Sequence, residues 1–415
     1  MRAVLFSDVD ILDGTGAPPF AGQVLVKGSR IAAVAPGNAA LSPDGAEVVQ
    51  GRGATLMPGL IEPHAHLSFT DIRVGTDLGA TPPEEHTLRT ARCARTLLEH
   101  GFTSCVSAAS AKPALDAAVR AAVEAGDLPG PRLLTASPEL TVTSGLGDAR
   151  LGHLYQESFA VVRDGPDGFR RYARQMVREG ADTIKINVSG DTLLPRARSG
   201  QTVMTEGEVQ AVCDVARAHG RRVAAHARSA EAVKLCLRNG VQIIYHANLV
   251  DAEARDLLEA HKHLVFLAPT IGWTVSVLER GPEFGRGADA RERAILQDEL
   301  AATIDNMRDL KQRGVRVLPG GDYGFAWNPN GTNARDLEHF VKLLGFTPME
   351  AIVAATRLGG EIMMRGEELG QVRPGFLADL LLVDGNPLAE VSILQDARRL
   401  RVVMKDGVLY RHRHS

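Results

Sequence analysis

The chain has 415 residues, of which 44% are hydrophobic and 23% charged, enough for a large core in one or two domains. Its 47 basic and 50 acidic residues give a formal net charge of -3, so charge gives no reason to expect nucleic acid or an anionic membrane as a partner. A small molecule is therefore the expected ligand.

The N-terminal segment alternates apolar and polar residues as strands do, with Gly, Pro and Asp turns between candidate strands at 2–12, 22–36 and 46–59. It lacks the basic leader, apolar run and cleavage site of a signal peptide. No apolar run approaches the roughly 18 residues of a membrane span. The four cysteines show no C-x-x-C spacing. We therefore expect a cytoplasmic protein whose N-terminus forms a small antiparallel sheet.

From about residue 55 the chain alternates short apolar runs with longer helical patterns, which is typical of βα units around a parallel sheet. The candidate strands are 55–66, 102–108, 132–137, 182–188, 222–227, 241–246, 263–269 and 315–322. The helical stretches are 86–100, 112–125, 166–179, 205–219, 229–239, 251–261 and 287–313. Eight parallel strands over roughly 310 residues predict an α/β fold of the expanded (β/α)8 TIM-barrel type.

A further helical stretch at 347–364 precedes a return to strand-like patterns at 370–385 and 398–411. We expect these strands to rejoin the N-terminal ones in a small β-sandwich domain built from both termini. The predicted boundaries are residues 1–55 and 366–415 for the small β domain and 56–365 for the barrel.

Polar residues close several predicted strands, at the barrel face that carries active sites. His64 and His66 are two apart on an extended chain, so both imidazoles point the same way. The other members of the set are Lys185, His226, His246 and Asp322. The four histidines and the carboxylate suit zinc, manganese, iron or cobalt, and five donors exceed what one tetrahedral ion with a bound water uses. The pattern predicts a site for two ions, or for one ion with open coordination.

Lys185 is the unusual member of this set, because burial beside cations disfavours a charged ammonium group. It must be neutral, paired or modified. Taken singly, His226 is more often a hydrogen-bonded structural residue than a ligand, and Lys185 is more often a lysine at the edge of a sheet. Six polar residues at or near the ends of predicted strands together favour the metal site.

These residues lie in motifs that resemble the amidohydrolase superfamily. The stretch PGLIEPHAH at 58–66 is similar to the family's PGLID-x-H-x-H opening, and 354–364 and 369–388 resemble its closing segment. A closer likeness to the prolidase-like branch, which contains Xaa-Pro dipeptidases, ochratoxinase and molinate hydrolase, is carried by 180–191, 221–251 and 318–324. The resemblance spans nearly the whole chain and implies a metal-dependent hydrolase acting on carbon–nitrogen bonds.

The resemblance also implies a role for each polar residue. Lys185 is expected to be N-carboxylated and to bridge two divalent metal ions, with zinc the expected metal. A hydroxide bridging the ions would attack the carbonyl carbon, and Asp322 would pass its proton to the leaving nitrogen. Relatives commonly form homo-oligomers, which we expect here too. The remaining ligands divide into His64, His66 and Asp322 for one ion and His226 and His246 for the other.

The residues that contact substrate are left open where the chain departs from the family's motifs. The loop after the third strand lacks the family's TGGHG motif, so His153 either replaces its histidine or is a surface residue. Tyr245 stands where relatives carry Glu, and either binds substrate or packs. Arg228 either holds a substrate carboxylate or is solvated at a helix start. Trp273 and Trp327, the chain's two tryptophans, predict an apolar or aromatic pocket.

We predict hydrolysis of an amide-type C–N bond in an N-acyl amino acid or a dipeptide-like small molecule. One alternative is an anilide, phenylurea or carbamate without a free carboxylate, and removing Arg228 would abolish the first activity and spare the second. Another is a deaminase or a cyclic amide or imidazolone hydrolase, against which Lys185 argues because many deaminases lack this lysine. A non-catalytic binding protein is the last alternative. The cost of burying five donors and a lysine merely for packing argues against it.

Overall fold

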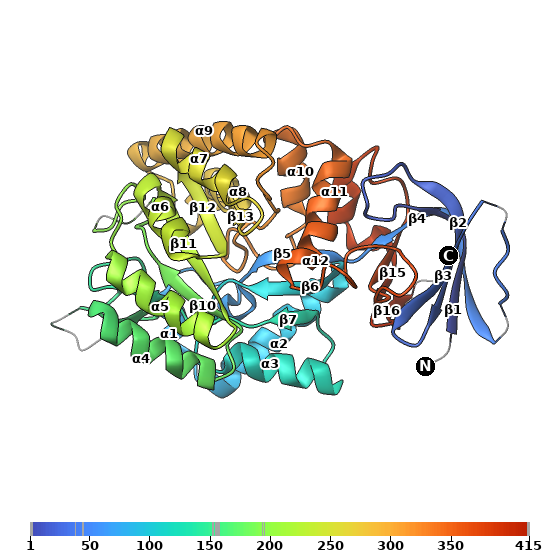
Figure 1. The fold of residues 1–415 in the computed structure, drawn as a ribbon, viewed down its shortest axis with the longest axis horizontal. Helices are drawn as coiled ribbons and strands as arrows, with labels where there is room; N and C mark the ends of the chain where they lie inside the picture. Colours follow the sequence, from blue (N-terminus) through green and yellow to red (C-terminus); the bar gives the residue numbers. More distant parts are fainter. Residues whose placement is uncertain are drawn as a thin grey trace.

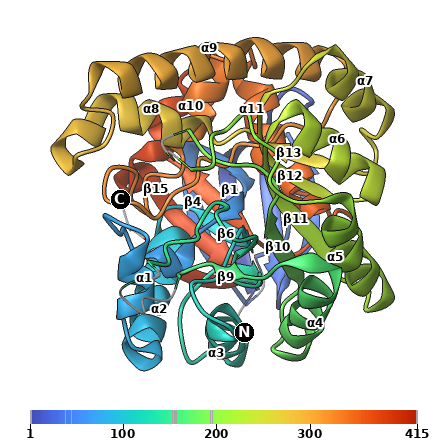
Figure 2. The same ribbon diagram turned by 90° about the vertical axis from the view of Figure 1, so that its left-hand side faces the viewer.

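The computed structural model describes residues 3–37, 39–43, 45–151, 153, 158–192, 194 and 196–412. Its long axis runs from a barrel, with helices around central strands, to a smaller sheet at the other end (Figure 1). Figure 2 looks along this axis from the barrel side, and the helices surround the strands there. Among the helices of these segments, none combines the length and apolar character that a membrane span requires.

The strands of the barrel are short, buried and parallel. They are β5 (Leu60–Ala65), β6 (Phe102–Ser107), β7 (Arg132–Leu134), β8 (Leu140–Thr141), β9 (Val161–Val162), β10 (Thr183–Asn187), β11 (Arg222–Ser229), β12 (Ile243–Leu249) and β13 (Phe266–Ala268). One sheet has the order β5-β6-β7 and another the order β13-β12-β11-β10-β8-β9. A bridge between Ala136 and Thr183 connects the two sheets. Each residue of β5, β6, β10 and β11 is buried, as expected for strands covered on both faces.

The predicted TIM barrel is confirmed, with two differences in detail. The segment predicted as the eighth strand, 315–322, makes only an isolated bridge, between Val317 and Leu267. Pro319, which has no N–H to donate, and two glycines end the pairing there. The short strands β8 and β9 extend the sheet and were not predicted.

Helices alternate with the strands and cover the outside of the barrel (Figure 2). They are α1 (Thr76–Ala80), α2 (Pro83–Glu99), α3 (Leu115–Ala125), α4 (Gly165–Arg178), α5 (Glu206–Ala218), α6 (Ala230–Asn239), α7 (Ala252–Ala260), α8 (Ile271–Arg280), α9 (Ala290–Gln312), α10 (Arg335–Lys342), α11 (Pro348–Ala355) and α12 (Arg357–Ile362). The 3-10 turns are η1 (Leu67–Phe69), η2 (Gly281–Phe284), η3 (Val391–Gln395) and η4 (Ala397–Arg399). Side chains of Ser229, Asp251 and Asp289 cap the N-termini of α6, α7 and α9. The helices α1, α8 and α10 lie outside the predicted stretches, and the stretch 347–364 forms two helices, α11 and α12. Several residues of α8 are β-branched, which lowers helix propensity.

Strands from both ends of the chain form one seven-stranded sheet in the order β16-β15-β14-β4-β1-β2-β3. They are β1 (Ala3–Ile11), β2 (Phe20–Lys27), β3 (Arg30–Pro36), β4 (Ala46–Pro58), β14 (Leu380–Val383), β15 (Leu400–Lys405) and β16 (Val408–His412). Neighbours are antiparallel except β1 and β4, which run parallel, so the expectation of a purely antiparallel sheet was wrong. Phe6, Leu56 and Leu380 belong to one apolar core to which both termini contribute. The small β domain built from both termini is confirmed, whereas its boundaries stay a prediction.

Arg132, at the start of β7, ties the barrel to the terminal sheet. Its Nη1 lies 2.5 Å from Oδ2 of Asp379, and its Nη2 pairs with Asp406. The Arg132 and Asp379 side chains are only 12% and 3% exposed, so this ion pair is largely withdrawn from water. Without Arg132, the buried carboxylate of Asp379 would lose its counterion.

We expect Arg132→Met to lower the free energy of unfolding by about 3–5 kcal/mol, because a buried charge is left uncompensated. Urea and thermal unfolding of the full chain would measure the change. Arg178→Met is the matched control, since the side chain of Arg178 is 74% exposed in its pair with Glu179. Equal destabilisation by the two substitutions would contradict this role of Arg132.

Candidate metal centre

A cavity of about 460 Å³ opens at the carboxyl ends of the barrel strands. Its walls come from the loops that follow several strands, which is where a TIM barrel builds its sites. The structure brings together in this cavity the six residues predicted as ligands: His64, His66, Lys185, His226, His246 and Asp322.

His64 and His66 leave β5 on the same side and face Asp322. Nε2 of His64 lies 3.5 Å, and Nε2 of His66 3.1 Å, from Oδ1 of Asp322. A ligand atom from each of the three lies within 4.8 Å of the other two. Gly320 permits this approach, because a Cβ there would lie 2.9 Å from the Cβ of His64. The three side chains are therefore placed to hold one cation.

The charges of these residues also suit a cation. Burial lowers the pKa of His64 well below its ordinary value, so its imidazole is neutral and can donate a lone pair. Burial alone would raise the pKa of Asp322, but the adjacent His64, His66 and Lys185 outweigh it and hold that pKa below its usual range. Oδ1 of Asp322 is buried and accepts no hydrogen bond from the described residues. An ionised, unsatisfied carboxylate beside imidazole nitrogens fits a bound divalent metal.

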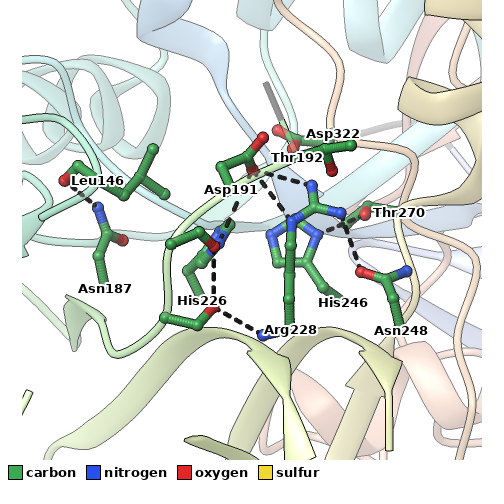
Figure 3. Close-up of polar contacts among 12 residues, drawn as sticks. Leu146, Asn187, Asp191, Thr192, His226, Arg228, His246, Asn248, Thr270 and Asp322 are labelled. Carbon is green, nitrogen blue, oxygen red and sulfur yellow. Dashed lines mark hydrogen bonds and ion pairs between the residues drawn. The ribbon is translucent and has the colours of Figure 1, made fainter. Parts of the chain in front are cut away.

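His226 and His246 form a second group of donors beside the first. Their ring centroids are 4.1 Å apart, and the ring of His246 lies 5.9 Å from that of His64. Nδ1 of His246 contacts Oγ1 of Thr270 at 2.6 Å, which leaves its Nε2 available to a metal ion. Burial, helped by the charge of Arg228, lowers the pKa of His226 to about 3, so this imidazole is neutral as well. Figure 3 shows the two histidines next to each other.

Lys185 is fully buried on β10 among these donors. Its Nζ lies 4.7 Å from the centre of the Tyr245 ring, and no carboxylate of the described residues forms an ion pair with it. Burial lowers the pKa of Lys185, although the charges of Glu139 and Asp322 oppose the shift. An unpaired lysine in such a place is consistent with a modified amine, and its carboxylation stays a prediction.

Arg228 is neither solvated nor free to take a substrate. Its side chain is 1% exposed, and Nη1 lies 2.6 Å from Oε1 of Glu299. Nε and Nη2 each lie 3.0 Å from Oδ2 of Asp191, and Nη1 also donates to Asn248 at 2.9 Å (Figure 3). Because Arg228 is buried, the interpretation of it as a solvated residue at a helix start is wrong. A substrate carboxylate would have to displace the partners of Arg228. The carboxylate contact stays untested, but this geometry disfavours it.

The other candidate substrate residues fall in different places. Trp273 and Trp327 both line the cavity, as predicted for an aromatic pocket. Tyr245 donates its hydroxyl to the carbonyl of Pro63 at 3.0 Å, and its ring packs 3.9 Å from that of His64, so the geometry favours packing, while its contact with substrate stays a prediction. His153 is exposed, and its contact with substrate stays a prediction.

Several residues of the cavity were missed from the sequence. Asp191 and Glu139 line it, as do Phe69 and Phe325. Asp191 follows β10 within a few residues, so the rule that found the histidines at strand ends could have found it. Glu62 lies beneath the cavity and accepts the backbone N–H of His64 at 2.9 Å. The two phenylalanines carry no polar signal and lie in a 3-10 turn and a loop, where hydrophobic periodicity is uninformative.

Comparison with known proteins agrees with this geometry. Residues 55–410 match the amidohydrolase family. The chain is 25% identical to ochratoxinase from Aspergillus niger in an alignment 382 residues long, and the match covers 87% of this chain and 76% of that protein. A crystal structure of a prolidase complexed with N-methylphosphonate-L-proline superposes with a TM-score of 0.89 at 28% identity and covers 99% of this chain and 100% of its own. A Xaa-Pro dipeptidase superposes with a TM-score of 0.86 at 26% identity, with the same coverage.

We expect Asp322→Asn to weaken divalent metal binding by at least about tenfold, because the substitution keeps the shape of the side chain but removes its charge. Calorimetric titration of metal-free protein with zinc would measure the affinity. Asp148→Asn is the matched control, since Asp148 lines the same cavity but is paired with Arg150. Wild-type zinc affinity in Asp322→Asn would show that Asp322 is not a ligand.

Proposed function

We propose, on the premise that this chain belongs to the amidohydrolase family, that it cleaves an amide-type C–N bond in an N-acyl amino acid or a dipeptide-like small molecule. The family predicted from the motifs is confirmed, and with it a metal-dependent enzyme acting on carbon–nitrogen bonds. The substrate, the identity of the metal as zinc, the cytoplasmic location and assembly into a homo-oligomer are proposals.

One observation carries the proposal: His64, His66 and Asp322 converge on the floor of a cavity that also holds His226, His246 and Lys185. We assign the first three to one metal ion, the next two to another, and an N-carboxylated Lys185 to both. Bound metal ions would supply a Lewis acid and lower the pKa of water. The other contributions to the reaction come from the chain's own side chains.

Asp322 is the proposed general base and acid. The lowered pKa keeps this carboxylate ionised, which is the protonation state that a general base requires. The same carboxyl group can then deliver the proton to the leaving nitrogen, which avoids expulsion of an amide anion. The apolar walls of the cavity limit the water around this exchange.

The relatives support a dipeptide-like substrate. The prolidase at 28% identity was crystallised with N-methylphosphonate-L-proline, and the relative at 26% identity is a Xaa-Pro dipeptidase. Both cover nearly the full length of this chain, including the segments that surround the cavity. A substrate in which an acyl group is joined to an amino-acid nitrogen is therefore the first candidate.

Anilides, phenylureas and carbamates are the second candidate, and the engagement of Arg228 favours them. The arginine proposed to hold a substrate carboxylate is occupied by Asp191 and Glu299. The aromatic wall built from Trp273 and Trp327 would suit an aryl group. Removing Arg228 no longer separates the two candidates, because it would leave two buried carboxylates unpaired and impair both activities.

Both candidates can be tested on one panel of substrates. We expect metal-loaded protein to hydrolyse at least one of N-acyl amino acids, Xaa-Pro dipeptides, anilides, phenylureas or carbamates. Chelation should abolish the activity and added zinc should restore it, because the proposed reaction depends on bound metal ions to polarise the carbonyl group and to lower the pKa of the attacking water. Release of the amine, measured by chromatography, is the readout. Undiminished hydrolysis by metal-free protein would refute the proposal, and the preferred substrate class would decide between the candidates.

A further inference from the structure

We propose that Arg286 determines substrate specificity by binding an anionic group at the end of the substrate remote from the scissile bond. The inference rests on the proposed function and names a class of substrate for the same cavity: amides whose aromatic body ends in a carboxylate. Arg286 lines the cavity from the segment between η2 and α9.

A ladder of rings leads from the metal centre to Arg286. The ring of Phe69 stacks on His66 at 3.9 Å, and Phe325 meets Phe69 edge-on at 5.7 Å. Trp327 stacks on Phe325 at 5.2 Å with the planes 20° apart, and the Arg286 guanidinium carbon lies 5.8 Å from the Trp327 ring. These five residues all line the cavity. Three aromatic side chains thus separate the ligand His66 from the arginine.

The backbone around Arg286 is held on both sides. Its N–H donates to the carbonyl of Gly281 at 2.9 Å, and the next residue, Gly287, donates its N–H to Oε2 of Glu292 at 3.1 Å. Gly281 is required for this turn, because a Cβ there would lie 2.7 Å from the carbonyl oxygen of Arg286. The turn therefore fixes where the side chain of Arg286 begins.

Arg286 is a cation of the cavity wall without a carboxylate partner among the described residues. Arg150, also in the lining, is bound to Asp148, and Arg228 behind the wall is bound to Asp191 and Glu299. Arg196 lines the cavity too, but its side chain is exposed, whereas Arg286 is partly buried beside Trp327. No carboxylate of the described residues pairs with Arg286, which is half-buried. An indole face stabilises a guanidinium only weakly, whereas a carboxylate can accept two parallel hydrogen bonds from it.

This placement defines the shape of the substrate. A carboxylate next to the scissile bond would lie near His66 and Asp322, not beyond Trp327. A substrate that reaches both ends of the ladder needs an aromatic or similarly flat body on Phe325 and Trp327, with its anion at the far end. The anion that Arg286 would bind is therefore a different group from the substrate carboxylate considered for Arg228.

Binding of biphenyl-4-carboxylate and of its neutral counterpart 4-acetylbiphenyl tests the subsite without any reaction. Fluorescence of Trp273 and Trp327, the chain's only tryptophans, reports occupancy of this cavity directly. We expect metal-loaded wild-type protein to bind the acid about tenfold to a hundredfold more tightly than the ketone. Arg286→Gln should remove this preference, and Arg286→Lys should keep part of it. Arg291→Gln, at an exposed arginine outside the cavity, should leave it intact.

An equal affinity of wild type for the two compounds, or a preference that survives in Arg286→Gln, would overturn the inference. The second result would indicate that the metals, not Arg286, hold the carboxylate. Hydrolysis of 4'-acetamidobiphenyl-4-carboxylate and of the matching methyl ketone separates this inference from the proposed function. If the acid binds selectively but neither amide is hydrolysed, the result counts against the proposed function for amides of this class and not against the role of Arg286. If wild type and Arg286→Gln each hydrolyse the acid and the ketone equally well, the role of Arg286 is overturned.

Discussion

The close approach of Gly320 to His64 is the contact on which the site depends. The segment 315–322, which closes the barrel, pairs with its neighbour only through the bridge between Val317 and Leu267. It lies against β5 because residue 320 has no side chain, and a Cβ there would meet both His64 and Pro63 at about 3 Å. Two residues later the backbone of Asp322 takes a positive φ of 58°, and its carboxylate faces the two histidines. The backbone of His246, which forms the second pair of donors with His226, also takes a positive φ, of 79°.

Burial and neighbouring charges set the protonation states of the groups in the cavity. Burial lowers the pKa values of His64, His226 and His246 and keeps these imidazoles neutral, whereas the carboxylate of Asp322 is ionised because imidazoles and a lysine surround it. Arg228 is paired with both Asp191 and Glu299 and lies 5.8 Å from the ring of Trp273, so one buried cation contacts both the polar floor and the aromatic wall. A set of buried polar groups of this kind is expensive unless a ligand completes it, and a cation does so.

Much of the fold and of the metal centre could be predicted from the sequence because both follow local rules. Apolar runs marked the barrel strands, and the ends of these strands placed the six candidate ligand residues in one cavity. The burial of Arg228 could not be predicted, because its partners Asp191 and Glu299 come from a loop and a helix far away in sequence. The row of rings through Phe325 and Trp327 could not be predicted either, because it joins segments that are far apart in sequence and meet only in the folded chain. Parallel pairing of β1 with β4 was missed because alternation along a strand does not reveal its partner.

Metal content per chain, measured on protein purified without chelator, tests the central claim of a binuclear centre most directly. Lys185→Ala should be compared with wild type and with Lys405→Ala, which removes another buried lysine far from the cavity. The account predicts about two equivalents of a divalent transition metal in wild type and Lys405→Ala, and a sharp fall in Lys185→Ala. About one equivalent in all three proteins would contradict it, and would make Lys185 a structural residue beside a mononuclear site.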